Sequence, residues 1–289
     1  MLHFRNPAVC VRLCTGLVLL CFSSLASADV VSITTTQDIV ATAEYRAGQA
    51  DLPAILIVHG FLQTRDFPTV SRLANSLNEL NYPILAPTLS LGIDARKSSL
   101  ACEAIQTHSM QQSVDEIALW VDWLIEKGHS SVVLVGHSAG STMAVAYLRS
   151  RPNPAVKKVA LISLSYFGQG KAAFEQEEDA LRAAQWLQQG RPGLDTYALA
   201  FCKTYIARPE DFLSYYSWSK DRSLEALEKS TAPVFVIIGG GDERMDREWV
   251  SRLEDSRVTL FGVPGANHFF DDVHEFDLLD QMERILEMP

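Results

Sequence analysis

The stretch 131–144 constrains the fold of this chain more than any other. It reads Ser-Val-Val-Leu-Val-Gly-His-Ser-Ala-Gly-Ser-Thr-Met-Ala. The short Val/Leu run is typical of a strand buried on both faces, and the helix formers after it indicate a helix. The chain must therefore turn sharply within Gly136-His137-Ser138-Ala139-Gly140, with Ser138 at the tip of the turn. Small residues fit there because strand and helix pack closely behind such a turn.

A turn of this kind lifts the hydroxyl of Ser138 out of the sheet and places it beside a helix N-terminus. Free N–H groups and the helix dipole favour developing negative charge at that position. The Gly-x-Ser-x-Gly pattern also arises by chance, and the alternative is a tight turn with an incidental serine. The strand before the motif and the helix after it favour a nucleophile.

A serine nucleophile needs a base and a group that orients the base. Two later strands are each followed by a suitable side chain. Asp242 follows the apolar run Val234–Ile238 and a three-glycine turn. His268 follows the run Val258–Val263 and the loop Pro-Gly-Ala-Asn.

The order Ser138, Asp242, His268 fits one site, because the carboxyl ends of parallel strands share one edge of a sheet. We expect His268 to be the base and Asp242 to hold its tautomer and stabilise its charged form. Asp246 remains an alternative acid, since a glycine turn leaves the register open.

An oxyanion hole would complete this chemistry with two N–H donors. The backbone N–H of Ala139, directly after the nucleophile, is one candidate. The second candidate is the N–H of Phe61, in the turn His59-Gly60-Phe61 that follows the run Pro53–Val58. Gly60 would let the backbone approach closely.

Strand and helix patterns alternate along most of the chain, which predicts an α/β fold with a mainly parallel central sheet and helices on both faces. The expected strands are Val30–Thr36 and Asp38–Tyr45 as an antiparallel pair, then Pro53–Val58, Pro83–Leu89, the run before Gly136, Val156–Tyr166, Pro233–Ile238 and Arg257–Val263. The expected helices are Phe67–Leu80, Gln111–Lys127, the one after Ser138, and Phe270–Met288.

Residues 168–231 carry no strand pattern and predict a helical cap inserted between two strands. The expected cap helices are Lys171–Gln189, Leu194–Ala207, Pro209–Trp218 and Ser223–Lys229. Aromatic residues crowd its second half, and they either pack the cap on its base or line a substrate pocket. They are Tyr205, Phe212, Tyr215, Tyr216 and Trp218.

Taken together, these motifs resemble the α/β-hydrolase superfamily over roughly residues 53–286. The resemblance rests on His59-Gly60, the pentapeptide around Ser138, Asp242 and His268. It implies an α/β-hydrolase fold with a cap like those of esterases, monoacylglycerol-lipase-like enzymes and lysophospholipases. The sequence His-Gly-Phe-Leu at 59–62 departs from the His-Gly-Gly-Gly of the hormone-sensitive-lipase type, which argues against bulky tertiary-alcohol esters.

The N-terminus predicts export. Arg5 and Arg12 precede the mostly apolar stretch Leu13–Leu25 and then Ala-Ser-Ala, which is typical of a secretory signal peptide cleaved after Ala28. The apolar stretch is short for a membrane span, and an uncleaved anchor is the alternative. We therefore expect residues 29–289 to form a single domain in the periplasm or outside the cell, with no stable membrane span.

Charge narrows the partners. The chain has 25 basic and 35 acidic residues, and removal of Arg5 and Arg12 leaves 23 against 35, a net charge of −12. An acidic body argues against nucleic acid as a partner.

No cysteine or histidine cluster has zinc-site spacing, and Gly239–Gly241 does not continue into a phosphate-binding motif, so we expect no metal or cofactor.

Two cysteines, Cys102 and Cys202, remain after export. An oxidising compartment permits a disulfide between them, and two separate buried thiols are the alternative. The segment 100–109 follows a strand end and should border the site. Its Glu103 and His108 either contact substrate or belong to a loop that Cys102 anchors.

The chemistry best supported by the sequence is hydrolysis of a carboxylic ester of modest size with an apolar acyl part, through an acyl-enzyme. Amide or thioester cleavage and acyl transfer use the same groups. A binding protein that keeps the fold without catalysis is a further alternative, and fold alone does not fix the substrate.

Overall fold

The computed structural model describes residues 28–168, 173–191 and 193–289. The predicted signal peptide therefore lies, apart from Ala28, outside the described residues, as does the start of the first predicted cap helix.

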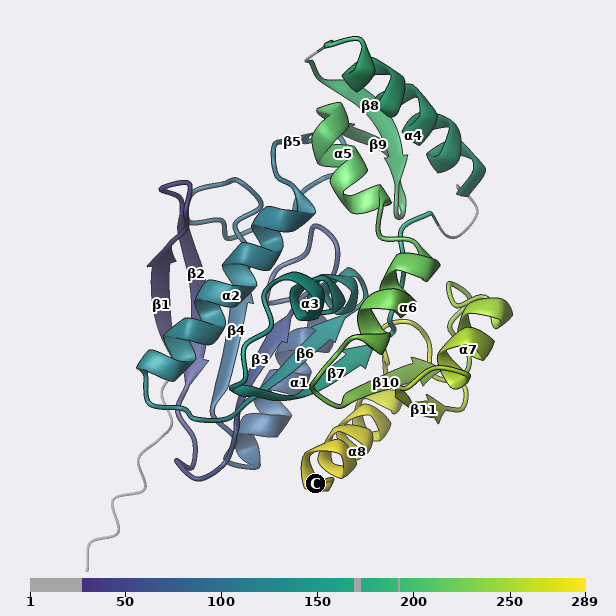
Figure 1. The fold of residues 1–289 in the computed structure, drawn as a ribbon. Coiled ribbons are helices and arrows are strands. Elements are labelled where there is room, and N and C mark those ends of the chain that lie inside the picture. The colour runs from purple at the N-terminus through teal and green to yellow at the C-terminus, as the bar shows by residue number, and fades with distance from the viewer. Residues whose placement is uncertain (1–27, 169–172, 192) are drawn as a thin grey trace, which may run out of the picture.

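An eight-stranded sheet forms the centre of the molecule, in the order β1-β2-β4-β3-β6-β7-β10-β11 (Figure 1). β1 and β2 pair antiparallel, β2 pairs antiparallel with β4, and all the other neighbours are parallel. The expected mainly parallel sheet is confirmed. The strands are β1 (Ala28–Thr34), β2 (Val40–Arg46), β3 (Ala54–Val58), β4 (Ile84–Thr88), β6 (Val132–His137), β7 (Val156–Ile162), β10 (Val234–Gly239) and β11 (Thr259–Val263).

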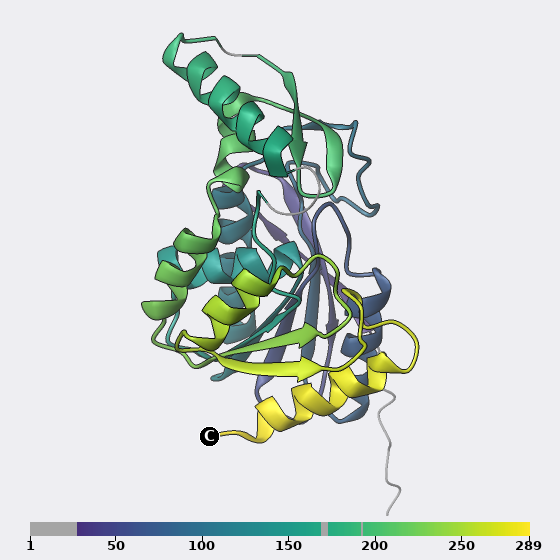
Figure 2. The ribbon, with the colours of Figure 1, turned by 90° about the vertical axis from the view of Figure 1, so that its right-hand side faces the viewer.

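Helices cover both faces of this sheet (Figure 2). α1 and α8 pack on one face with Ile55 and Ile57, whereas α2 and α3 pack on the other with Leu56 and Val58. The alternation along β3 explains why its residues are all apolar: both faces of a central strand are buried. The helices are α1 (Pro68–Glu79), α2 (Met110–Glu126), α3 (Ala139–Ser150), α4 (Ala173–Gln188), α5 (Pro209–Tyr216), α6 (Lys220–Glu228), α7 (Arg247–Glu254) and α8 (His274–Glu287).

Local signals account for several helix starts. Pro68 occupies the first turn of α1, where its missing N–H costs nothing. Ser109 and Gln112 form a capping box at the start of α2. α7 is an addition to the predicted helices, and the Asp246 side chain caps it by accepting from the Trp249 N–H at 2.8 Å.

The prediction of a helix at Leu194–Ala207 is wrong. The segment forms two strands, β8 (Asp195–Leu199) and β9 (Cys202–Ala207), which pair antiparallel around a turn where Ala200 has a φ of 53°. β9 also pairs in parallel with β5 (Ile105–Gln106), a short strand in the segment expected to be a loop. The two strands pair with each other inside the segment and β9 pairs with a strand about a hundred residues earlier, and such pairing decides strand formation more than the local pattern does.

The insertion between β7 and β10 therefore mixes helices with a small sheet of order β5-β9-β8. Figure 1 shows α4, β8, β9 and α5 above the end of the central sheet, whereas α6 lies lower. α6 packs against α3 and belongs to the helical layer of the core. We use "cap" below for α4, β8, β9 and α5.

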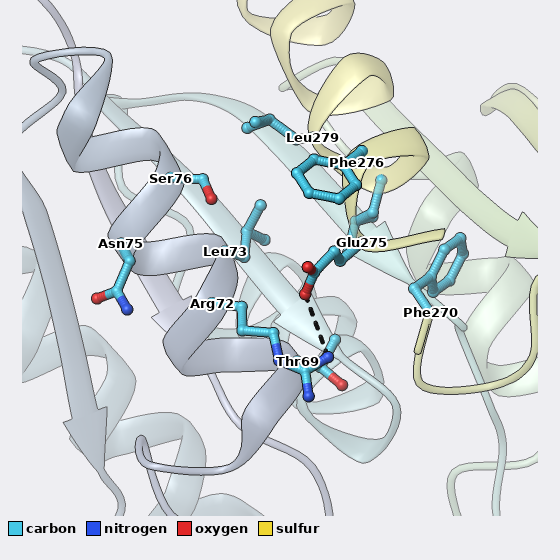
Figure 3. A pocket seen from close by; sticks show the side chains of 10 residues that line it. Thr69, Arg72, Leu73, Asn75, Ser76, Phe270, Glu275, Phe276 and Leu279 are labelled. Carbon is cyan, nitrogen blue, oxygen red and sulfur yellow. Dashed lines mark ion pairs between the residues drawn. The ribbon is translucent and has the colours of Figure 1, made fainter. Parts of the chain in front are cut away.

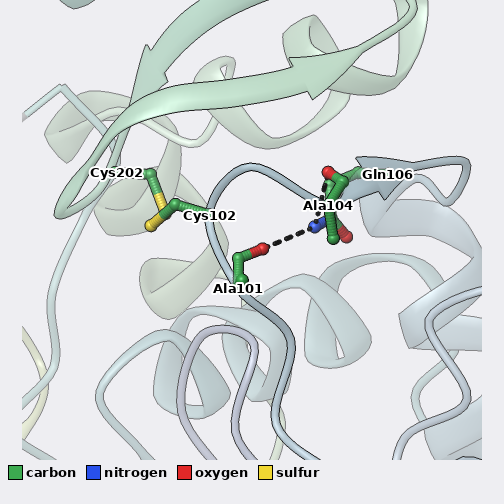
Figure 4. Close-up of a disulfide and its surroundings, with 5 residues drawn as sticks. All are labelled: Ala101, Cys102, Ala104, Gln106 and Cys202. Carbon is green, nitrogen blue, oxygen red and sulfur yellow. Dashed lines mark hydrogen bonds between the residues drawn. A yellow bond between two sulfur atoms is a disulfide. The ribbon is translucent and has the colours of Figure 1, made fainter.

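A disulfide joins the cap to the segment before α2. Cys102 and Cys202 are bonded, with their Cα atoms 5.3 Å apart (Figure 4). Of the two alternatives for these cysteines, the structure contains the bonded one.

Candidate active site

Ser138 occupies the turn between β6 and α3 in a strained conformation. Its φ is 56° and its ψ is −123°, outside the usual regions for a residue with a side chain. The flanking glycines make this turn fit. A Cβ on Gly136 would lie 2.5 Å from the carbonyl oxygen of Gly140, and a Cβ on Gly140 would lie 2.4 Å from that of Val58. The strand-to-helix turn expected from the sequence is thus present, with Ser138 at its tip.

Three side chains from separate strand ends form a continuous hydrogen-bond chain. His268 Nε2 lies 2.8 Å from Ser138 Oγ, and His268 Nδ1 lies 2.7 Å from Asp242 Oδ2. Because a carboxylate only accepts, Nδ1 carries the proton, and the lone pair of Nε2 faces the serine hydroxyl. The Asp242 side chain is fully buried and that of His268 is 5% exposed.

Close backbone packing brings Asp242 to the histidine. A Cβ on Gly239 would lie 2.2 Å from the carbonyl oxygen of Ala266, so the turn after β10 touches the loop that carries His268. Asp242 Oδ1 accepts from the N–H of Arg244 at 3.0 Å, which fixes the rotation of the carboxylate.

The backbone of His268 is also held. Its carbonyl oxygen accepts hydrogen bonds from Ser163 Oγ at 2.9 Å and from His137 Nε2 at 3.1 Å. Burial lowers the pKa of His137 to about 3, so its ring is neutral and serves as a structural donor. The loop of His268 is therefore anchored to the strand that precedes the nucleophile.

Asp246, the alternative acid, has a different environment. Besides capping α7, it accepts from the Tyr166 hydroxyl and from Lys220 Nζ, the latter at 3.1 Å. None of its hydrogen bonds involves His268, so the structure places Asp242 and not Asp246 beside the imidazole.

The two residues expected to supply the oxyanion N–H groups, Phe61 and Ala139, lie in segments next to Ser138. Ala139 is the first residue of α3, where N–H groups have no partner within the helix. The loop at Gly60 and Phe61 passes directly over the nucleophile, since a Cβ on Gly60 would lie 3.4 Å from Ser138 Cβ. Among the described loop hydrogen bonds, none uses the N–H of Phe61, whereas that of Gly60 donates to Gln63 Oε1.

His59 braces this loop from below. Its Nδ1 donates to the carbonyl oxygen of Gly60 at 2.8 Å, and its Nε2 accepts from the N–H of Leu89 at 3.0 Å. Complete burial lowers the pKa of His59 to about 3, which keeps the ring in the neutral form that these bonds require.

Arg96 was not identified from the sequence, yet it connects three segments at the site. Arg96 is 4% exposed, and its guanidinium donates to the carbonyl oxygens of Gln63 and Leu89, both at 2.7 Å, and of Ser98 at 2.8 Å. An arginine in a long loop normally lies in solvent, so no sequence pattern signalled this burial.

Four of the five aromatic residues predicted for the cap are buried, and Tyr216 is partly buried. Tyr205, Phe212 and Tyr215 are each 0% exposed and Trp218 is 4% exposed. Of the two readings for these rings, packing of the cap on its base is the one the structure supports for these four.

In the 100–109 segment, Glu103 is exposed and His108 is buried. The ring of His108 packs edge-on against Tyr215, and its two nitrogens have no hydrogen-bond partner among the described residues. The disulfide anchors this segment, in agreement with the second of the two predicted roles.

A separate pocket lies between α1 and α8 (Figure 3). Arg72 and Glu275 form an ion pair across it at 3.2 Å. Its lining includes none of Ser138, Asp242 and His268, so it is not the site described above.

Within the described residues, no group of His, Cys, Asp and Glu side chains is arranged to hold a metal ion. No helix in the described part of the chain has both the length and the apolar character needed to cross a bilayer.

A family model described as "Alpha/beta hydrolase family" matches residues 55–285. The chain belongs to the alpha/beta hydrolase family. A search of curated proteins finds no significant match. The resemblance drawn from the sequence motifs is confirmed, and so is the α/β-hydrolase fold.

Several solved structures are similar to this chain over most of its length. Est1E from Butyrivibrio proteoclasticus has a TM-score of 0.64 at 16% identity, covering 88% of this chain and 96% of Est1E. The alpha/beta hydrolase GrgF from Penicillium sp. sh18 has a TM-score of 0.69 at 15% identity, with coverage of 90% and 98%. The thioesterase domain from the curacin biosynthetic pathway has a TM-score of 0.57 at 16% identity, with coverage of 91% and 100%.

Proposed function

We propose that this protein is a serine hydrolase that cleaves carboxylic esters through an acyl-enzyme. The observation that supports it most directly is the unbroken hydrogen-bond chain from Asp242 through His268 to Ser138. A binding protein has no need of a strained serine on a buried acid–base pair, since this arrangement serves to activate a nucleophile.

In the first half-reaction, Ser138 Oγ attacks the ester carbonyl while His268 Nε2 takes its proton. The tetrahedral oxyanion accepts hydrogen bonds from the N–H groups of Phe61 and Ala139. The imidazolium, stabilised by Asp242, then protonates the leaving alcohol as the C–O bond breaks. The product of this step is an ester between the acyl group and Ser138.

In the second half-reaction, His268 removes a proton from water, whose oxygen attacks the acyl-enzyme. The tetrahedral intermediate collapses, His268 returns the proton to Ser138 Oγ, and the carboxylic acid leaves. No further group is needed for either step to balance.

The proposed substrate is an ester of small to medium size with an apolar acyl part. Thioester cleavage is the second candidate, and the similarity in fold to a thioesterase domain supports it. Acyl transfer and amide cleavage would use the same residues.

We further propose that the protein works in the periplasm or outside the cell. The signal-peptide pattern of residues 1–28 and the Cys102–Cys202 disulfide support this, because disulfides persist in oxidising compartments. N-terminal sequencing of protein recovered from the periplasm should begin at Asp29, and an intact Met1 would contradict export with cleavage.

The decisive experiment for catalysis combines labelling and turnover. A fluorophosphonate should add one adduct to Ser138 in the folded wild type and none in Ser138→Ala, as read by mass spectrometry. The wild type should hydrolyse p-nitrophenyl butyrate with a burst, and matched oxoester, thioester and amide substrates should rank the leaving groups. A folded wild type that is neither labelled nor active on any of the three would support the binding protein instead.

A further inference from the structure

Phe201 is an unusual residue of the cap. It lies in the turn between β8 and β9, and 59% of its surface is exposed. Its ring nevertheless contacts the ring of Phe61, with centroids 5.9 Å apart in an edge-to-face arrangement. Phe61 is the residue whose N–H is proposed to hold the oxyanion, so Phe201 contacts the side chain of a residue in the oxyanion loop.

The other rings around Phe61 differ from Phe201 in exposure. Phe167, Tyr205 and Tyr215 also contact Phe61, with ring centroids 5.8, 5.7 and 6.0 Å from that of Phe61, respectively. These three are buried. Among the described rings that contact Phe61, Phe201 is thus the one with an open apolar face.

A loop of contacts fixes the position of Phe201. The neighbouring Cys202 is bonded to Cys102, and two residues before Cys102 the N–H of Leu100 donates to the carbonyl oxygen of Leu62 at 2.9 Å. Leu62 follows Phe61 directly. The disulfide therefore ties the turn of the cap hairpin to a segment that is itself bonded to the oxyanion loop.

The segment that carries Cys102 is itself ordered by hydrogen bonds. Gln106 Nε2 donates to the carbonyl oxygens of Ala104 at 3.2 Å and Ala101 at 3.4 Å (Figure 4). The pairing of β5 with β9 holds the other end of the hairpin. Loss of the disulfide would thus release the hairpin turn while the strands stay paired.

We infer that Phe201 is a specificity-determining residue of the ester site, and that the Cys102–Cys202 disulfide positions it. Its exposed ring is a wall against which the apolar group of the substrate packs, next to the oxyanion loop. This inference rests on the proposed ester hydrolysis. The Phe201 ring selects substrates with an extended apolar or aromatic group over those with only a methyl group, because packing on the ring removes apolar surface from water.

The test compares substrates within two series. One series changes the acyl chain, with p-nitrophenyl acetate against p-nitrophenyl hexanoate, and the other changes the alcohol, with methyl acetate against benzyl acetate. In each series the preference is the ratio of kcat/KM for the larger ester to that for the smaller. Phe201→Ala should lower this ratio about tenfold in at least one series, in the range expected for contacts to an apolar pocket, whereas Phe201→Leu should retain most of it.

Phe276→Ala is the matched control, because Phe276 is 65% exposed and lies on α8, at the pocket that excludes the catalytic groups. It should keep the wild-type ratio in both series. The variant with Cys102→Ala and Cys202→Ala should shift the ratio in the same direction as Phe201→Ala. A shift in Phe201→Ala without one in the disulfide-free variant would overturn the positioning role of the disulfide.

Ratios within twofold of the wild type for Phe201→Ala in both series would overturn the inference while leaving ester hydrolysis intact. Failure of the proposed function has a different signature: the wild type itself shows no turnover in either series and no fluorophosphonate label on Ser138. That outcome would overturn both proposals.

Discussion

Removal of the Cys102–Cys202 disulfide should lower the free energy of unfolding substantially. The bond joins residues 100 positions apart in the sequence, so it closes a loop that includes β6, α3 and β7. For a loop of this length, the entropy it removes from the unfolded chain corresponds to about 4.7 kcal/mol at 25 °C. Measured effects fall below this limit, and we expect a loss of about 2–4.7 kcal/mol.

Urea unfolding of the mature protein, followed by circular dichroism, measures this loss. The variant with both cysteines replaced by alanine is compared with oxidised wild type. Alanine is chosen because Cys202 is 1% exposed and serine would bury a hydroxyl there. Reductant should move the wild-type midpoint toward that of the variant and leave the variant unchanged. A difference below about 1 kcal/mol would refute the entropic reasoning, given the loop length.

Two further predictions concern the acid and the buried histidines. Asp242→Asn should lower kcat about 10³- to 10⁴-fold in steady-state assays, because an amide favours the wrong tautomer of His268. Asp246→Asn should keep kcat near the wild-type value, and equal losses in the two variants would contradict the assignment of Asp242 as the acid. Burial lowers the pKa of His59, His108 and His137 to about 3, from 6.5 in the unfolded chain, so acidification favours unfolding. Between pH 7.5 and 5.5 each should cost about 1.4 kcal/mol of stability, about 4 kcal/mol in total, and urea midpoints that do not fall over this range would contradict the linkage.

The sequence predicted the central sheet and the convergence of the three side chains because both depend on local patterns. Apolar runs mark buried strands, and Ser138, Asp242 and His268 each follow the carboxyl end of one. Parallel pairing then brings those ends to one edge. The glycines at 239–241 predicted a turn, but the close approach of Gly239 to Ala266 is seen only in the structure.

The features that escaped prediction depend on distant partners. β8 and β9 pair with each other across a turn, and β9 also pairs with the distant strand β5; the periodicity of Leu194–Ala207 did not reveal either pairing. Arg96 is charged and lies in a loop, so its burial follows only from the carbonyl groups that surround it. The exposed ring of Phe201 was likewise visible only once the disulfide and the hairpin turn were placed.

The guanidinium of Arg96 has a consequence for how this protein tolerates sequence change. One rigid guanidinium donates hydrogen bonds to the carbonyl oxygens of Gln63, Leu89 and Ser98 at once, so these three backbone positions must keep their mutual spacing. We expect a residue inserted into any one of these segments to move its carbonyl oxygen away and leave an N–H donor of the buried guanidinium without an acceptor. Length variation among close relatives should therefore concentrate elsewhere, and engineered insertions will be accepted more readily at the outer end of the cap than beside this arginine.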